Sequence, residues 1–134
     1  MFAVVFAVAL LAGVEPPRAD DKADCIENYE TLIKADPTKV VAACNTLAAL
    51  GDVRAQNNLG WLFANGQGVQ RDYPKAQHWF RMAADQGLAE AQTSVGWMYG
   101  TGIGVPKDYV EAVNWYKKVR FAGECTHWRE RANR

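Results

Sequence analysis

Few side chains in this sequence have the type and spacing that acid–base or nucleophilic chemistry requires. Ser94 is the only serine, and no lysine stands three residues after it, as a Ser-x-x-Lys hydrolase needs. The two histidines, His78 and His127, have no histidine or cysteine partner at metal-site spacing. We therefore expect no catalytic residue, no metal and no cofactor.

Three cysteines, Cys25, Cys44 and Cys125, are the remaining reactive groups. A disulfide between two of them would persist only in an oxidising compartment. Because the count is odd, one thiol is left over. Which pair can meet depends on the elements that carry the cysteines.

A repeat of 36 residues organises the second half of the chain. Residues 52–87 and 88–123 match at 12 of 36 positions when they are aligned without gaps. The matched pairs are Ala55/Ala91, Gln56/Gln92, Gly60/Gly96, Trp61/Trp97, Gly66/Gly102, Gly68/Gly104, Val69/Val105, Asp72/Asp108, Tyr73/Tyr109, Ala76/Ala112, Trp79/Trp115 and Gly87/Gly123. A fixed period of this length is typical of stacked structural repeats.

Each copy is expected to fold as helix, glycine loop and second helix. The first helix is predicted over residues 53–65, where Leu59, Leu62 and Phe63 share one face. The loop over residues 65–69 contains glycines, which take positive φ without steric cost.

The second helix of each copy is expected to begin at an aspartate N-cap. Asp72 and Asp108 fill this role, and Glu111 is placed to complete a capping box with Asp108. Gly87 is expected to end the first of these helices.

Gly60 and Gly96 lie inside predicted helices, where glycine costs about 1 kcal/mol relative to alanine. Close approach of the second helix would offset this cost. We expect Ala76 to lie opposite Gly60, and Ala112 opposite Gly96.

Weaker half-repeats flank this core. Residues 22–35 should form one helix, and residues 36–51 a second helix that begins at Asp36 and turns Leu47 and Leu50 inward. Residues 124–134 should form a polar capping helix with Trp128 turned inward. The inward residues of the first helix are expected to be Ile26, Tyr29, Leu32 and Ile33.

The N-terminal 14 residues are almost wholly apolar but too short to span a bilayer, which takes about 20 residues. Residues 1–19 are therefore predicted to be a secretory signal cleaved after Ala19, although no basic residue precedes the apolar run. The alternative is a buried N-terminal helix. After cleavage, the mature protein would have no membrane anchor.

Charge and composition limit the class of partner. Hydrophobic residues make up 49% of the chain and charged residues 22%, as in a globular protein. Lysine plus arginine (15) equals aspartate plus glutamate (15), so there is no cationic surplus for nucleic acid. We expect a protein or peptide partner.

The repeated motif resembles the Sel-1-like repeat, a relative of the tetratricopeptide repeat. The resemblance rests on an Ala-Gln pair before Leu-Gly-Trp or Val-Gly-Trp, a Gly-x-Gly-Val loop, and Asp-Tyr followed by Ala and Trp. It covers residues 52–123 clearly and 36–51 loosely. It implies an all-α fold, an α-solenoid of stacked antiparallel helix hairpins. Members of the family resemble adaptors in bacterial envelope assembly, signalling, secretion and host interaction.

The resemblance implies a concave groove lined by the first helix of each repeat. The residues predicted to face it are Arg54, Asn57, Trp61 and Ala64, then Glu90, Thr93, Trp97 and Gly100. Aromatic residues dominate binding hot spots. The alternative is that both tryptophans only pack between repeats. Gln56 and Gln92 are predicted to hydrogen-bond across the turn between repeats.

The repeat offset also predicts the disulfide. Cys25 corresponds to Trp61 and Cys44 to Phe80, which lie at similar heights in an antiparallel hairpin. A Cys25–Cys44 bridge would therefore link the two helices of the N-terminal hairpin to each other. Cys125 would be free or intermolecular. Cysteine-rich members of the family carry a cysteine pair in every repeat, which this chain lacks.

Three functions remain open. The first is an exported, non-catalytic adaptor in the periplasm of a bacterium or secreted from it. The second is an enzyme of β-lactamase or penicillin-binding type, as suggested for cysteine-rich relatives. The third is an accessory subunit that caps an envelope complex. The predicted organisation is residues 1–19 signal, 20–51 hairpin, 52–87 and 88–123 repeats, and 124–134 cap.

Overall fold

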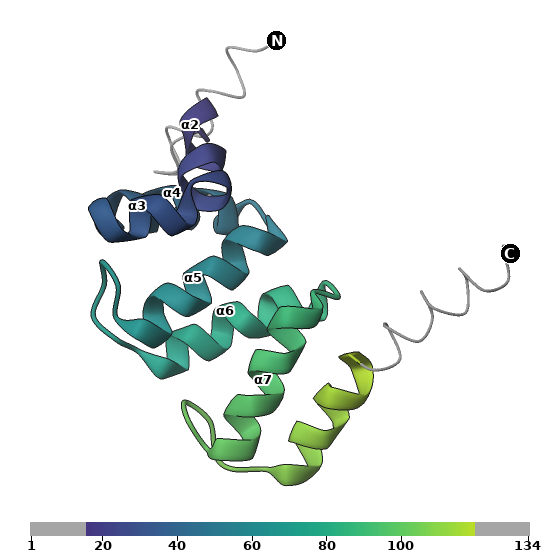
Figure 1. Cartoon of the computed structure of the whole chain (residues 1–134). Coiled ribbons are helices and arrows are strands. Elements are labelled where there is room, and N and C mark those ends of the chain that lie inside the picture. The colour runs from purple at the N-terminus through teal and green to yellow at the C-terminus, as the bar shows by residue number, and fades with distance from the viewer. Residues whose placement is uncertain (1–15, 120–134) are drawn as a thin grey trace, which may run out of the picture. The chain divides into compact units, whose positions relative to one another are not determined.

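A computed structural model describes residues 16–119, and within this range the regular secondary structure is entirely helical (Figure 1). The terminal predictions, for the signal segment up to residue 15 and for the cap over 124–134, lie outside the described residues. The helices are α2 (Ala19–Lys22), a π-helical turn η1 (Ala23–Glu27), α3 (Tyr29–Ala35), α4 (Pro37–Ala49), α5 (Val53–Asn65), α6 (Tyr73–Asp85) and α7 (Ala89–Thr101). A further helix begins at Tyr109 and is described to residue 119, and we call it the 109–119 helix.

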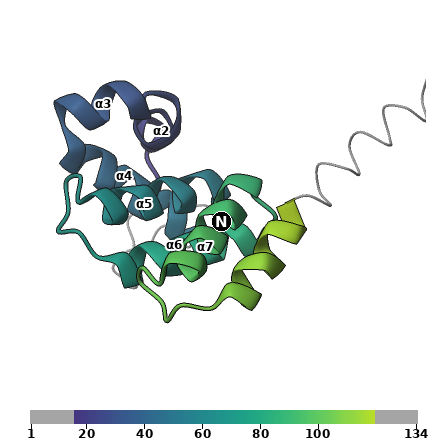
Figure 2. The same ribbon diagram turned by 60° about the horizontal axis from the view of Figure 1, so that its bottom comes forward.

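The chain divides into two compact units between Arg71 and Asp72. In the first unit α4 packs against α5, and in the second α6 packs against α7, as Figures 1 and 2 both show. Each pair therefore joins the second helix of one repeat to the first helix of the next. None of the helices within residues 16–119 is long and apolar enough to cross a membrane.

The predicted aspartate caps are confirmed. The Asp36 carboxylate accepts a hydrogen bond from the Lys39 N–H (3.2 Å), and Asp72 accepts one from the Lys75 N–H (3.0 Å). Asp108 accepts from the N–H groups of Val110 and Glu111, both at 3.0 Å. These bonds satisfy backbone donors that the first helical turn leaves open.

The hydrogen bonds around Asp36 and Asp108 show two further features of these caps. The Thr38 hydroxyl and the Lys39 N–H both donate to Asp36 and lower the pKa of its carboxyl group. The capping box predicted between Asp108 and Glu111 is wrong, because the Asp108 N–H donates to the Tyr99 carbonyl at 2.9 Å.

The second glycine of each loop touches the start of the preceding helix. Gly68 and Gly104 have φ of +71° and +77°. A Cβ on Gly68 would lie 2.6 Å from the Pro37 carbonyl oxygen, and one on Gly104 would lie 2.8 Å from that of Tyr73. Because Pro37 and Tyr73 open α4 and α6, the loop after α5 or α7 lies directly on the backbone of its partner helix.

The other end of each helix pair is joined by a glutamine. The Gln56 side-chain amide donates to the Ala48 carbonyl, and that of Gln92 donates to the Ala84 carbonyl, both at 3.2 Å. Both glutamines are buried. The predicted hydrogen bond across the turn between repeats is confirmed in both copies.

The glycine inside α7 marks a close helix approach, as predicted, but its neighbour differs from the one expected. A Cβ on Gly96 would lie 3.0 Å from the Tyr116 ring, whereas Gly100 lies opposite Ala112, at 3.8 Å between the added Cβ and the alanine Cβ. The 109–119 helix is thus offset on α7 by about one turn from the predicted register, in which Ala112 lies opposite Gly96. The pair Gly60 and Ala76 falls in different units and stays a prediction.

The single helix predicted over residues 22–35 is wrong. The segment is divided into α2, the π-helical turn η1 and α3, and at Asn28 the backbone leaves helical geometry (φ −106°, ψ 11°). A π-helical turn holds an additional residue and shifts the faces of the helix. This segment therefore buries Asp24 and Cys25, while the predicted inward residues Ile26, Tyr29, Leu32 and Ile33 are only half-buried.

In α4 the buried residues are likewise not all those predicted. Leu50 is exposed and Leu47 is half-buried. Leu50 is the C-cap of α4, beyond the last residue that packs inward. The residues that α4 does bury are Val40, Val41, Ala43, Cys44 and Ala48.

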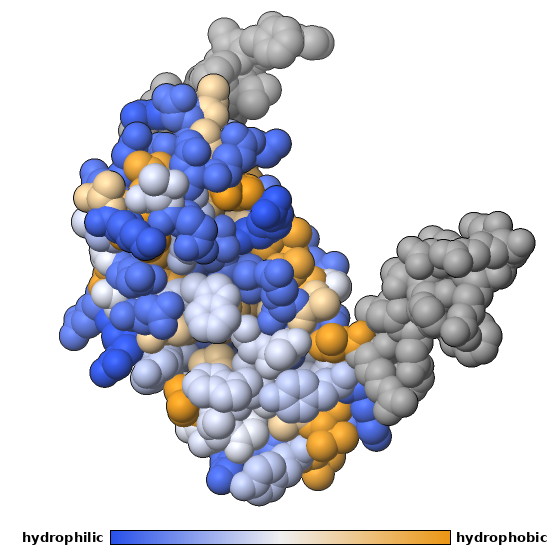
Figure 3. Space-filling model, viewed as in Figure 1, coloured by the Kyte–Doolittle hydropathy of each residue, from blue (hydrophilic) through white to orange (hydrophobic). Residues whose placement is uncertain are grey.

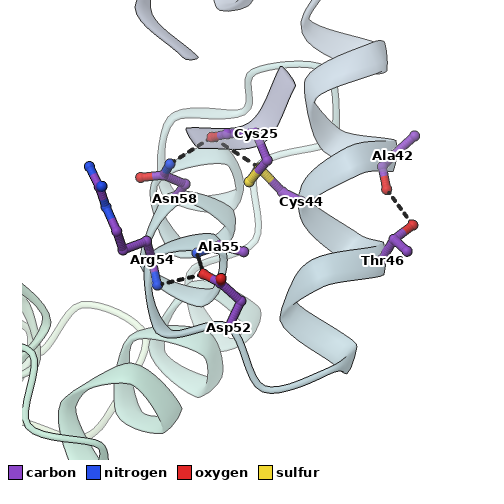
Figure 4. The surroundings of a disulfide bond; sticks show 8 residues. All are labelled: Cys25, Ala42, Cys44, Thr46, Asp52, Arg54, Ala55 and Asn58. Atoms are coloured by element: carbon purple, nitrogen blue, oxygen red, sulfur yellow. Dashed lines mark hydrogen bonds between the residues drawn. A yellow bond between two sulfur atoms is a disulfide. The ribbon is translucent and has the colours of Figure 1, made fainter. Parts of the chain in front are cut away.

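A disulfide joins Cys25 in η1 to Cys44 in α4, with 4.9 Å between the two Cα atoms (Figure 4). Both residues are fully buried. The Cys25 carbonyl oxygen accepts a hydrogen bond of 2.8 Å from the Asn58 side chain on α5. The bridged segment is therefore connected to both α4 and α5.

An ion pair supports the same junction. The Lys39 ammonium lies 3.1 Å from the Asp24 carboxylate, whose residue is buried. The hydrogen bond and the charge of Asp24 raise the pKa of Lys39. A buried carboxylate is thus matched by a cation that itself remains in contact with water.

Replacing Gly104 by alanine should lower the free energy of unfolding more than replacing Gly87. Both glycines have positive φ, and nothing lies within 4 Å of a Cβ built on Gly87. Gly87→Ala should therefore cost about 1–2 kcal/mol for its left-handed backbone alone. Gly104→Ala should cost about 1–3 kcal/mol more, because the Tyr73 backbone must move. Urea unfolding measures the difference, and equal losses in the two variants would contradict the contact.

Loss of the disulfide should lower the free energy of unfolding by about 3 kcal/mol, because the bridge closes a loop of about 20 residues. The comparison is between the native chain and a Cys25→Ser/Cys44→Ser variant in urea unfolding. A Cys125→Ser variant is the control, since it removes a thiol and keeps the bridge. The prediction fails if the double variant and this control unfold at the same urea concentration.

Candidate functional site

The first helices of the two repeats, α5 and α7, place equivalent residues inside and outside. Each buries a small residue and a glutamine near its start and two apolar residues further on. The equivalent buried pairs are Ala55/Ala91, Gln56/Gln92, Leu59/Val95, Gly60/Gly96 and Leu62/Met98. Because these positions face the partner helix, the opposite side of each helix is left toward solvent.

That outer side carries one tryptophan in each helix. Trp61 is 43% exposed and Trp97 is 49% exposed. Seven residues before each tryptophan, and so on the same face, stand the exposed residues Arg54 and Glu90. Each helix therefore presents an indole and a charged side chain together.

Not every residue predicted for this surface is exposed. Asn57 is buried, and its Oδ1 atom has no hydrogen-bond partner among the described residues. Thr93 is exposed, and its hydroxyl donates to the Ala89 carbonyl at 3.0 Å. Asn57 is 5% exposed, so it does not share the exposure of Arg54 and Trp61, and its role in partner binding stays a prediction.

The other two residues predicted for this surface, Ala64 and Gly100, are half-buried. Gly100 lies opposite Ala112 of the 109–119 helix. Trp61 with Arg54 belongs to the first unit, and Trp97 with Glu90 and Thr93 belongs to the second. The two surfaces are therefore described separately.

Trp115, on the 109–119 helix, shows what a structural tryptophan looks like in this protein. It is buried, and its indole N–H donates to the Glu111 carboxylate at 3.0 Å. The Arg81 guanidinium and the Lys118 ammonium lie 4.8 and 3.6 Å from ring centroids of its indole. The Trp115 indole therefore makes its hydrogen bond and its ring contacts inside the fold and stabilises it. Trp61 and Trp97 differ from it by their exposure.

The residues considered for catalysis have structural surroundings. Ser94 is buried, and its hydroxyl donates to the Glu90 carbonyl at 3.0 Å. His78 is exposed and lies edge-on to Trp79, with 5.4 Å between the ring centroids. Within residues 16–119, histidine, cysteine and carboxylate side chains form no group of three or more that could hold a metal ion. Cys125 and His127 lie outside the described residues.

Sequence reasoning missed a second exposed surface, formed by apolar residues of the 109–119 helix. Tyr109, Val110, Val113 and Tyr116 are all exposed. In Figure 3, pale and orange side chains replace blue ones over much of the second unit near α7 and this helix. The available signal was that Val110 and Val113 replace Pro74 and Gln77 of the first repeat.

The chain resembles known proteins through its repeats. A family model described as the Sel1 repeat matches residues 53–88 and 89–118. The boundary between these matches agrees with the 36-residue period. No curated protein matches the chain significantly.

Three solved structures are similar to this chain. A Sel1 repeat protein from Oxalobacter formigenes is 35% identical with a TM-score of 0.68, over 76% of this chain and 39% of that one. A protective antigen of uropathogenic Escherichia coli, c5321, which displays an SLR fold, is 28% identical with a TM-score of 0.72, over 90% of this chain and 25% of that one. Cysteine rich protein B of Helicobacter pylori is 18% identical with a TM-score of 0.68, over 87% of each chain, and shows likeness in fold.

The chain thus spans 39% and 25% of the first two proteins. From the family model and these structures, the chain contains two consecutive Sel1 repeats and belongs to the Sel1-repeat family of helical repeat proteins.

Proposed function

We propose that this protein is an exported, non-catalytic adaptor that binds a peptide or protein partner through the outer faces of α5 and α7. The observation that carries the proposal is the exposure of a tryptophan at the same position of both repeats, 43% for Trp61 and 49% for Trp97. Sel1 repeats are protein-interaction modules, which supports the same class of function.

Each tryptophan is attached to a rigid support. The backbone beneath Trp61 belongs to a 13-residue helix capped by Asp52, whose carboxylate accepts from the N–H groups of Arg54 and Ala55. Trp97 follows Gly96, which lies against the Tyr116 ring. A preorganised indole loses little entropy on binding, so its burial contributes directly to affinity.

The charged neighbours indicate the chemistry of the bound segment. Arg54, two turns before Trp61 on the same face, favours an apolar segment that carries a carboxylate, because a guanidinium pairs with carboxylates in two parallel hydrogen bonds. Glu90, two turns before Trp97 on the same face, favours an apolar segment that carries a basic residue. The two surfaces therefore favour segments of opposite charge.

Export is supported by the cysteines and by the N-terminal sequence. The Cys25–Cys44 disulfide requires an oxidising compartment to persist. The apolar residues 1–14 have the length of the central region of a secretory signal. We propose the periplasm or the exterior of a bacterial cell as the site of action.

Replacing Trp61 or Trp97 by alanine should reduce partner recovery at least tenfold, because tryptophans at interface centres contribute about 2 kcal/mol or more. The measurement is quantitative affinity purification of the tagged chain from an envelope fraction, comparing each variant with wild type. Met82→Ala is a matched control, since Met82 is an exposed apolar residue, at 38%, on a different helix. Equal recovery of every partner by wild type and both tryptophan variants would refute the binding surface, provided circular dichroism shows all variants folded.

The proposed compartment predicts the redox state of the cysteines in cells. A Cys125→Ser variant, trapped in acid and treated with a maleimide polymer, should take up no label before reduction and two labels after it. Fractionation should place it outside the cytoplasm. Two labels before reduction, together with recovery among cytoplasmic proteins, would contradict export.

A further inference from the structure

The outer face of α5 carries an amide between its charged residue and its tryptophan. Asn58 stands four residues after Arg54 and three before Trp61, so the three side chains share one face of the helix. Asn58 is half-buried, whereas the other two are exposed. The Asn58 Nδ2 group donates to the Cys25 carbonyl at 2.8 Å (Figure 4). The surface around Trp61 is therefore bordered by η1.

This hydrogen bond orients the Asn58 amide. Because the NH2 group donates to the Cys25 carbonyl, the amide oxygen Oδ1 must point the other way. Figure 4 shows Oδ1 directed away from Cys25, on the side of α5 that carries the Arg54 side chain. Within residues 16–119, Oδ1 accepts no hydrogen bond. A fixed acceptor thus lies on the same face as a guanidinium and an indole.

The position of the Cys25 carbonyl is in turn set by links to α4. Cys25 is buried and is joined covalently to Cys44 of α4. The preceding residue, Asp24, is buried and lies 3.1 Å from the Lys39 ammonium, also of α4. The carbonyl that holds the Asn58 amide is therefore attached to the adjacent helix by a covalent bond and an ion pair.

The second repeat has no such arrangement at the equivalent position. The residue that corresponds to Asn58 is Ser94, whose hydroxyl donates to the Glu90 carbonyl of its own helix at 3.0 Å. Within residues 16–119 the Ser94 side chain bonds to no other segment. The surface around Trp97 thus lacks both the oriented amide and the bridged segment, and it serves as an internal control.

We propose that Asn58 is a third partner-binding residue of the Trp61 surface and that the Cys25–Cys44 bridge positions it. Oδ1 accepts a hydrogen bond from an N–H group of the partner, while Arg54 pairs with a carboxylate. The bound segment therefore combines an acidic side chain, an unpaired N–H and an apolar residue. The inference rests on the proposed function of this surface and adds to it a specificity residue and a dependence on the disulfide.

The binding test uses as probe a protein that the wild-type chain recovers and the Trp61→Ala variant loses, purified and titrated by calorimetry. Asn58→Ser, which introduces the residue of the second repeat and keeps the bridge, should weaken binding about three- to tenfold, because one hydrogen bond is lost. Cys25→Ser/Cys44→Ser should weaken it by a similar factor although Asn58 is intact. Ser94→Ala is the matched control on α7 and should leave the affinity unchanged.

A second measurement needs no partner and separates positioning from general stability. In ¹⁵N–¹H correlation spectra of the full chain, the Asn58 side-chain amide and the Trp61 indole N–H should shift when the bridge is removed. The Trp97 indole N–H should keep its position, because no contact links α7 to the bridge. Equal shifts of both indoles would indicate a general loss of structure and would contradict the proposal.

The outcomes distinguish this inference from the function on which it rests. Equal affinity of the wild type and Asn58→Ser would overturn the role of Asn58. Weaker binding by Asn58→Ser with unchanged binding by Cys25→Ser/Cys44→Ser would overturn positioning by the disulfide. If Trp61→Ala loses no protein that the wild type recovers, the proposed function of the surface fails first, and the inference fails with it.

Discussion

The pairing of helices in this protein depends on direct contact between a loop glycine and the backbone at the start of the preceding helix. Gly68 lies on Pro37, and Gly104 lies on Tyr73, with the same separation along the chain. A Cβ at either place would meet a carbonyl oxygen at less than 3 Å. The buried glutamines Gln56 and Gln92 join the other end of each pair. With both ends joined, the rotation of α5 on α4 and of α7 on α6 is determined.

This fixed rotation decides which side chains meet solvent. Since alanine, glutamine and leucine or valine positions of α5 and α7 face the partner helix, Trp61 and Trp97 face outward. The same rule applied to the 109–119 helix leaves Tyr109, Val113 and Tyr116 exposed. The proposed binding surface around Trp61 and Trp97 is thus a consequence of this packing geometry.

The N-terminal segment is held by different means. Its sequence lacks the alanine–glutamine pair and the glycine loop, and it forms two short helices around a π-helical turn. The disulfide between Cys25 and Cys44, the Asn58 hydrogen bond to the Cys25 carbonyl, and the ion pair of Asp24 with Lys39 connect it to α4 and α5. A segment with little buried apolar surface of its own gains stability from such cross-links.

Local sequence determined much of this protein: the bounds of α5, the aspartate caps, the left-handed loop glycines, the Cys25–Cys44 pairing and the glutamine bonds. These features follow from backbone preferences and from a period that places equivalent residues in equivalent surroundings. Only the tertiary structure decided that the helix predicted over residues 22–35 is divided, that Gly96 lies against Tyr116 and that Asn57 is buried. It also decided that Tyr109, Val113 and Tyr116 are exposed. Each of these depends on which neighbour covers a helix face, and the periodicity of one helix shows that a face is apolar without showing what lies against it.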